Sequence, residues 1–264
     1  MAEAIRVALA GYGRLGSELA RGLARAPEVE LVGIARRSAG GGQVTLEGRA
    51  IPVREAVPAL LDETRPRVLV EASLPDASRA HVMAALERGV SPVIATSGLA
   101  DAALAEIRAA CRERRIGGVW APNLSVGAVV LMHLASIAGR YFDHVDIIEM
   151  HRDTKADAPS GTALHTARLL ALARGGDFTR AATARLTLPE VRGGAVAGVG
   201  IHSVRLPGLV AHQEVIFGGL GQTLTLRHDA TSNESYVPGA LLAIKHAARA
   251  RELTEGLAAL LGLA

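Results

Sequence analysis

The fold of this chain is decided by IRVALAGYGRLG, residues 5–16. Residues 5–10 form a mostly apolar run typical of a buried strand, and a helical pattern follows over residues 17–26. The glycines between them are spaced G-x-G-x-x-G, and a second strand over residues 29–35 completes a strand–helix–strand unit. Because such a turn lets a pyrophosphate approach a helix start, we predict that a dinucleotide binds Gly11, Tyr12, Gly13, Arg14, Leu15 and Gly16. A tight turn without a ligand is the alternative.

The end of the second strand indicates which nicotinamide dinucleotide is preferred. An NAD site places Asp or Glu about 20 residues beyond the glycines, where the carboxylate binds the ribose 2′-hydroxyl. This chain has Arg36 and Arg37 there, and two guanidinium groups suit a 2′-phosphate. We predict NADPH as the cofactor, with NADH possible; two solvated arginines are the alternative interpretation.

Strands and helices continue to alternate as far as residue 123. The pattern predicts a glycine-rich loop over 38–48, strands over 67–73, 91–98 and 118–123, and helices over 75–88 and 101–115. This alternation predicts a Rossmann-like, doubly wound parallel sheet, whose ligands bind at the carboxyl ends of the strands. Four polar residues fall at such ends, and we expect them near the nicotinamide half of the cofactor: Ser73, Thr96, Ser97 and Asn123.

The pattern changes after residue 123. A long apolar helix is predicted over 124–141 and a strand over 145–149, followed by short strand-like runs at 185–188, 198–205, 212–217 and 222–228 and by helices over 237–249 and 253–263. We therefore predict a second α+β domain with a mixed or antiparallel sheet. Residues 1–123, completed by C-terminal helices over 236–264, form the dinucleotide-binding domain, and residues 124–235 form the second domain.

The chemistry is concentrated in HRDTKADAPSGTA, residues 151–163. Ser160 is placed to cap a helix, and the backbone N–H groups at that helix start can bind an anion. His151 exchanges a proton near neutral pH. Lys155 is one of only two lysines in the chain, the other being Lys245, and an ammonium releases a proton where a guanidinium does not.

Together these residues suit reduction of a carboxylate-bearing acceptor. Ser160, Gly161 and Thr162 are predicted to bind a carboxylate of the substrate, while His151, Arg152 and Lys155 supply positive charge and protons. Taken singly, each has a structural alternative: an ordinary histidine, a surface lysine, a plain helix cap. Their concentration within twelve residues favours the functional interpretation.

Composition excludes several other classes of function. The 264 residues carry a formal net charge of +3, without a basic block and with only 3% aromatic residues, so a nucleic-acid site is not expected. We expect no membrane span and no signal peptide. The single cysteine, Cys111, is predicted to be a packing residue and suits a reducing cytoplasm. We predict no metal site, because the three candidate ligands lack a short ligand spacing: His202, His212 and His228.

At this point a family resemblance becomes specific. The run from Glu149 to Ala163 resembles the signature of 4-hydroxy-tetrahydrodipicolinate reductases (dihydrodipicolinate reductases), and the similarity extends over essentially the whole chain. It implies a Rossmann-like domain joined to a substrate-binding and tetramerisation domain, and NAD(P)H-dependent reduction in the diaminopimelate route to lysine. By position, His151 resembles the family's acid/base histidine, Lys155 its proton donor, and Gly161 and Thr162 its carboxylate-binding residues. The family's cofactor contacts further correspond to Ala95, Thr96 and Ser97 and to Ala121, Pro122, Asn123 and Leu124.

The chain departs from the family pattern inside its most diagnostic stretch. The family usually has a second histidine where Arg152 stands. The guanidinium can still bind a carboxylate, but the titratable group of that histidine is absent. Two alternatives therefore remain: a reductase of another cyclic imine or amino-acid precursor on the same scaffold, and a non-catalytic NADP(H)-binding regulator. A homotetramer that binds a small dicarboxylate is what the resemblance implies.

Overall fold

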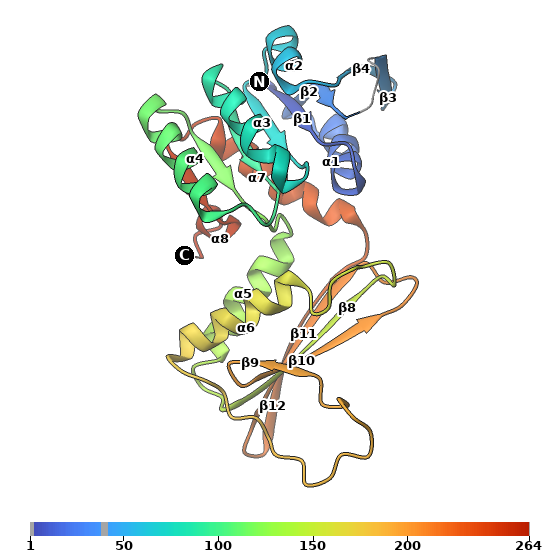
Figure 1. The fold of residues 1–264 in the computed structure, drawn as a ribbon, viewed down its shortest axis with the longest axis vertical. Coiled ribbons are helices and arrows are strands. Elements are labelled where there is room, and N and C mark those ends of the chain that lie inside the picture. Colours follow the sequence, from blue (N-terminus) through green and yellow to red (C-terminus); the bar gives the residue numbers. More distant parts are fainter. Residues whose placement is uncertain (1–2, 38–41, 264) are drawn as a thin grey trace. The chain divides into compact units, whose positions relative to one another are not determined.

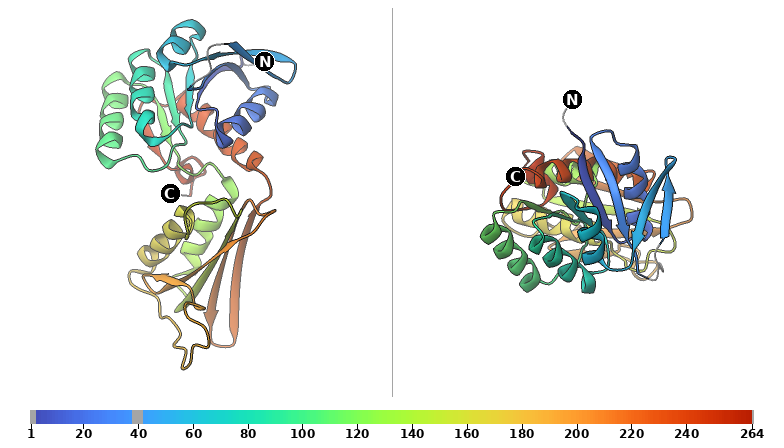
Figure 2. Two further views of the ribbon diagram at one scale, coloured as in Figure 1. Left: turned by 45° about the vertical axis from the view of Figure 1, so that its right-hand side comes forward. Right: turned by 90° about the horizontal axis from the view of Figure 1, so that it is seen from above.

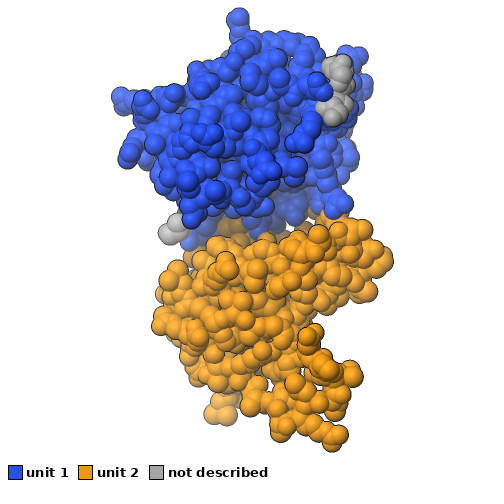
Figure 3. All heavy atoms as spheres, in the orientation of Figure 1, with its two compact units in different colours: residues 1–126, 233–264 blue, residues 127–232 orange. Residues whose placement is uncertain are grey.

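A computed structural model of the chain describes residues 3–37 and 42–263. The chain divides into two compact units, Met1–Val126 with Asn233–Ala264 and the intervening Gly127–Ser232 (Figure 3). No helix in the described ranges combines the length and the apolar character that crossing a membrane requires.

The first unit is built on an eight-stranded sheet, as far as the described residues show. All neighbouring strands run parallel except the β3–β4 pair. Because helices cover both faces, the central strands are mostly apolar, and β5 and β6 are buried at every residue. In spatial order, the strands are β13 (Leu253–Glu255), β7 (Gly118–Trp120), β6 (Ser91–Ile94), β5 (Val68–Glu71), β1 (Ile5–Ala10), β2 (Val29–Ala35), β4 (Arg49–Arg54) and β3 (Gly42–Leu46).

Helices pack in two groups against this sheet (Figure 1). One group places α2 (Val57–Thr64), α3 (Pro75–Glu87) and α4 (Asp101–Arg114) side by side. In the other, α1 (Arg14–Arg25) contacts η1 (Asn233–Tyr236) and α7 (Val237–Ala247), and α7 packs on β5, β6, β7 and α8 (Leu257–Leu260). The C-terminal segment thus helps to complete the unit that the N-terminal segment begins. Cys111 is a residue of α4 whose side chain is buried in the core, and this burial raises the pKa of its thiol to about 11.

The second unit contains a five-stranded mixed sheet. Its order is β12 (Gln222–Ala230), β11 (Ala211–Gly219), β8 (His144–His151), β10 (Val199–Arg205) and β9 (Gly194–Val196). Only β8 and β10 run parallel; the other neighbours are antiparallel. The helices α5 (Val126–Ala138) and α6 (Gly161–Arg174) lie on one face of this sheet (Figure 2). The α/β fold class with a second, mixed sheet is therefore confirmed.

Three predictions of local structure are wrong. Residues 42–46 belong to the predicted loop over 38–48 but form β3, because their alternating apolar residues pair with those of β4 at the sheet edge; residues 38–41 lie outside the described ranges. Residues 185–188 form no strand: Leu186 and Leu188 are exposed, and no neighbouring strand covers them. Residues 253–255 are not helical but form β13, which pairs with β7, and Gly256 with φ +81° separates it from α8.

Candidate functional site

The glycine turn between β1 and α1 has the geometry of a dinucleotide-binding turn. Gly11 adopts φ +94°, and a Cβ there would lie 2.5 Å from the carbonyl oxygen of Ala72. A Cβ on Gly16 would lie 2.0 Å from the carbonyl oxygen of Gly11, so the helix packs directly on the turn. A Cβ on Gly13 would meet no atom within 4 Å, and no side chain caps α1. The start of α1 thus has space at Gly13 and no side-chain cap, which suits a pyrophosphate.

Tyr12 and Arg36 lie together beside this turn. Arg36 directly follows β2, and its guanidinium carbon lies 6.0 Å from the centre of the Tyr12 ring. Arg36 and Arg37 are both exposed, and neither forms an ion pair with a carboxylate in the described part of the chain. Two unneutralised guanidinium groups at the end of β2 suit a phosphate on the ribose.

The other predicted cofactor residues follow the carboxyl ends of β5, β6 and β7. Backbone hydrogen bonds join these ends: the Ala95 N–H donates to the Glu71 carbonyl, and the Ala121 N–H donates to the Ile94 carbonyl. The Thr96 hydroxyl donates to the Ser73 carbonyl at 3.0 Å, so one side chain links two of the turns. The structure thus brings the segments around residues 73, 95–97 and 121–124 to one edge of the sheet, the edge where Gly11 and Arg36 lie.

Some of these polar side chains support the backbone. The Ser73 hydroxyl donates to the buried carboxylate of Glu71, which also bonds His81 Nδ1 at 2.9 Å. The Asn123 Oδ1 accepts from the Ser125 N–H at 2.9 Å. Leu124 is buried, whereas Pro122 and Ser97 are exposed. Ser73 and Asn123 therefore hold turns in shape, and Ser97 offers an open hydroxyl.

In the second unit, the loop after β8 ends in a capped helix start. The Ser160 hydroxyl accepts from the Ala163 N–H at 3.2 Å, so Ser160 is the N-cap of α6, as predicted from the sequence. A Cβ on Gly161 would meet nothing within 4 Å. The N–H groups of Gly161 and Thr162 lie in the first helical turn and have no acceptor within the helix, so they are available to an anion.

His151 is the last residue of β8, held by a buried carboxylate. Its Nδ1 lies 2.5 Å from Glu149 Oε2, and the Glu149 side chain is fully buried. Arg205, on the neighbouring β10, donates from Nη2 to Glu149 Oε1 at 2.7 Å. Burial raises the pKa of the Glu149 carboxyl, but hydrogen bonds from His151, Arg205 and Ser203 outweigh it and lower that pKa to about 2. The carboxylate is therefore ionised at neutral pH.

Lys155 lies in the loop between β8 and α6. Its Nζ donates to Asp157 Oδ1 at 2.6 Å, and this bond lowers the pKa of the Asp157 carboxyl. The Lys155 N–H donates to the Arg152 carbonyl at 3.2 Å, which closes a tight turn. Three cationic or titratable side chains thus lie between the end of β8 and the capped start of α6: His151, Arg152 and Lys155.

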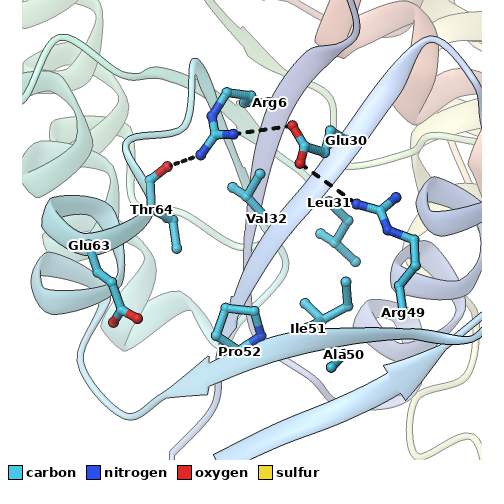
Figure 4. A pocket seen from close by; sticks show the side chains of 10 residues that line it. All are labelled: Arg6, Glu30, Leu31, Val32, Arg49, Ala50, Ile51, Pro52, Glu63 and Thr64. Carbon is cyan, nitrogen blue, oxygen red and sulfur yellow. Dashed lines mark hydrogen bonds and ion pairs between the residues drawn. The ribbon is translucent and has the colours of Figure 1, made fainter.

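Elsewhere in the first unit, a pocket of about 290 Å³ lies at the amino ends of β1, β2 and β4 (Figure 4). Its charges neutralise one another: Arg6 donates to Glu30 at 3.2 Å and to the Thr64 carbonyl at 2.6 Å, and Arg49 lies 3.8 Å from Glu30. This pocket opens at the edge of the sheet opposite to the glycine turn, so it does not belong to the candidate site. The described residues contain no group of three His, Cys, Asp or Glu side chains able to hold a metal.

Sequence reasoning gave no role to Glu149 or Arg205. The signal was present in the strand pattern: Val145, Ile147 and Glu149 lie on the buried face of β8, so a carboxylate occupies a position where the alternation predicts an apolar residue. A charge at such a position requires a partner, and Arg205 provides it from the adjacent strand.

Comparison with known proteins agrees with both halves of this description. The sequence profile described as "Dihydrodipicolinate reductase, N-terminus" matches residues 5–124, and the one described as "Dihydrodipicolinate reductase, C-terminus" matches residues 127–261. The 4-hydroxy-tetrahydrodipicolinate reductases of Moorella thermoacetica and Bacillus velezensis are 44% and 41% identical to this chain, the first over 99% and the second over 97% of either sequence.

A solved structure shows the same relationship. The dipicolinate-bound dihydrodipicolinate reductase from Paenisporosarcina sp. TG-14 superposes with a TM-score of 0.85 at 36% identity, covering 97% of this chain and 98% of that one. Fold, signature and overall similarity converge, and the chain therefore belongs to the dihydrodipicolinate reductase family of oxidoreductases.

Proposed function

We propose that this protein catalyses the NADPH-dependent reduction of 4-hydroxy-tetrahydrodipicolinate to tetrahydrodipicolinate, in the diaminopimelate route of lysine biosynthesis. The observation that carries the proposal is the start of α6. A capped helix with an open glycine follows His151, the last residue of β8, and a loop that bears Arg152 and Lys155. This arrangement combines a carboxylate-binding backbone with proton-bearing side chains, and the relatives are named 4-hydroxy-tetrahydrodipicolinate or dihydrodipicolinate reductases.

NADPH is proposed as the reductant because of the residues at the end of β2. When bound, the cofactor supplies a hydride from its nicotinamide ring. Gly13 and the uncapped start of α1 offer room and N–H donors for the pyrophosphate. Arg36 and Arg37 offer positive charge to a 2′-phosphate, and no acidic residue stands at that place to favour NADH.

The residues of the second unit would handle the substrate. The N–H groups of Gly161 and Thr162 and the Arg152 guanidinium bind the carboxylates, with Ser160 shaping the helix start. His151 and Lys155 hold the protons: one of them protonates the atom that becomes anionic when the hydride arrives. Lys155 is the proposed donor, and the Lys155–Asp157 pair holds the ammonium in place between turnovers.

The two units divide these tasks. We propose the unit formed by the N- and C-terminal segments as the dinucleotide-binding domain, and residues 127–232 as the domain for substrate binding and oligomerisation. On the sheet of the second unit, β12 is exposed over residues 222–225 and again at residues 227 and 229, which suits contact with further copies. A homotetramer in the cytoplasm is the proposed state, and light scattering of the purified protein measures the assembly.

One coupled assay tests the function. The preceding synthase generates 4-hydroxy-tetrahydrodipicolinate in place, and the absorbance of the reduced nicotinamide is followed with NADPH or NADH. We expect turnover with both cofactors and a lower KM for NADPH. Turnover only on another cyclic imine would establish the alternative reductase, and cofactor binding without turnover on any substrate would establish the regulator. An equal or lower KM for NADH would refute the cofactor preference alone.

A further inference from the structure

The buried carboxylate of Glu149 is an exception in the strand that carries it. Along β8, Val145, Ile147 and Glu149 alternate on the buried face, and the first two are apolar. Glu149 itself is fully buried. Because burial of an ionised carboxylate is unfavourable without partners, a chain that needed only packing would carry an apolar residue there.

The contacts of Glu149 account for both of its oxygens. Oε2 accepts from His151 Nδ1 at 2.5 Å. Oε1 accepts from Arg205 Nη2 at 2.7 Å, and the Ser160 N–H lies 3.4 Å from the same oxygen. The carboxylate is thus fixed from β10 and from the start of α6, and it holds the ring of the proposed catalytic histidine from the Nδ1 side.

Arg205 extends this network to the loop. The same Nη2 that binds Glu149 also donates to the Asp157 carbonyl at 2.8 Å, while the Asp157 side chain binds Lys155. Glu149 and Arg205 therefore connect His151, the loop that carries Lys155 and the cap of α6. Both proposed proton-bearing groups depend on one buried ion pair for their support.

We propose that Glu149 is a positioning residue: with Arg205 as its counterion, it fixes the His151 imidazole so that Nε2 is presented for proton exchange. This inference rests on the proposed function, since it assigns the tautomer and orientation of a histidine that the reaction uses. A carboxylate bound to one ring nitrogen selects which nitrogen faces the reacting group. The charged and titratable groups that face Glu149 are Arg205 from β10 and His151 from its own strand, with Lys155 and Asp157 in the adjoining loop.

The second unit offers a matched control. Asp146 lies on the same strand, three residues before Glu149, and its Oδ2 lies 3.3 Å from Nε2 of His202 on β10. This is also a carboxylate–histidine pair, but it joins β8 to β10 and lies nearer the start of β8, outside residues 151–163. A variant at Asp146 removes a carboxylate–histidine pair without touching the proposed site.

The experiment compares Glu149→Gln with Asp146→Asn in the full-length protein. We expect Glu149→Gln to lower kcat by about tenfold or more, the scale of a mispositioned acid–base group, with a much smaller change in the KM for substrate. Asp146→Asn should leave kcat unchanged.

A second variant and a second measurement separate this inference from the proposed function. Glu149→Asp keeps the charge but withdraws it by one methylene, so it should also lower kcat. Nitrogen-15 NMR of the substrate-free protein should show Nδ1 of His151 protonated in the wild type and altered in Glu149→Gln, whether or not the protein turns over this substrate. An unchanged His151 spectrum in Glu149→Gln, wild-type kcat in Glu149→Asp, or an equal loss in Asp146→Asn would overturn the proposal. A wild type without reductase activity would refute the proposed function instead.

Discussion

The chain contains two helix starts suited to anions, and they are built in opposite ways. The N-cap of α1 is Gly13, which has no side chain to accept from the helix N–H groups. A Cβ at this glycine would meet nothing within 4 Å. The start of α6 has a side-chain cap, Ser160, and a buried carboxylate beneath it. Backbone alone shapes the first site, whereas side chains shape the second.

This difference fits the tasks proposed for the two sites. A pyrophosphate is bound but not transformed, so N–H donors and space are sufficient. A substrate that gains a hydride and a proton needs groups whose proton and position are controlled, and these are side chains. Substitutions at the α1 site should therefore change KM for the cofactor, while substitutions in the loop before α6 should change kcat.

The largest expected effect is on Lys155. Lys155→Ala removes the proposed proton donor and should lower kcat by about 10²-fold or more, measured with saturating NADPH and substrate. The matched control is Lys245→Ala, because Lys245 is the only other lysine. It lies on α7, and its Nζ donates to Glu28 Oε1 at 2.9 Å. Normal kcat in Lys155→Ala would remove Lys155 from the mechanism and would leave His151 as the proton donor.

The arginines after β2 test the cofactor side of the comparison. Replacing Arg36 and Arg37 together by Ala should raise the KM for NADPH by about tenfold to a hundredfold, since charge-assisted hydrogen bonds to the 2′-phosphate would be lost. The KM for NADH should change little, and kcat should stay near that of the wild type. Arg140→Ala, at an exposed arginine outside both sites, is the control. An equal rise for both cofactors would contradict a role in 2′-phosphate binding.

The open glycines of the two helix starts give the most direct comparison. A methyl group fits at Gly13 and at Gly161 without contact to the chain, so both alanine variants should fold normally. Gly13→Ala should raise the KM for the dinucleotide, and Gly161→Ala the KM for the dicarboxylate, each by about tenfold as the methyl group blocks the N–H donors. Gly176→Ala, where a Cβ also meets nothing within 4 Å, controls for the substitution itself. If Gly13→Ala instead raised the KM for the dicarboxylate and Gly161→Ala the KM for the dinucleotide, the assignment of the two sites would be reversed.

Much of this architecture follows from local sequence patterns. The glycine spacing at residues 11–16 and the apolar runs of β1, β5 and β6 fix a parallel sheet, because each depends on period and turn chemistry within a few residues. The cap at Ser160 was predicted for the same reason. The strand β13 was missed because short strands acquire their identity from distant partners: it exists through its pairing with β7, more than 130 residues away. The strand β3 was missed because the glycine-rich composition around it favours a loop, although its partner β4 follows after only two residues.

The candidate site shows the same limit. Its residue types could be predicted, since the residues between His151 and Thr162 stand together in the chain. The support from Arg205 could not, because it reaches Glu149 across 56 positions through the parallel pairing of β8 and β10. Sequence proximity identifies the groups that face a ligand, whereas strand register determines which residues hold them.

The Lys155–Asp157 pair gives the smallest expected effect and tests whether this loop is held by charge. The folded-state pKa of Asp157 is lowered by its bond to Lys155, so the pair stabilises the fold above the ordinary carboxyl pKa of 3.8 and loses that contribution as pH falls below it. The Asp157 side chain is 57% exposed, so solvent screens the pair and its contribution is at most about 1 kcal/mol. Asp157→Asn should lower the free energy of unfolding at pH 7 by that small amount and have no effect near pH 2, as measured by urea denaturation. Asp153→Asn, in the same loop, is the control, and an Asp157→Asn effect that persists at pH 2 would mean that packing, not charge, holds this loop.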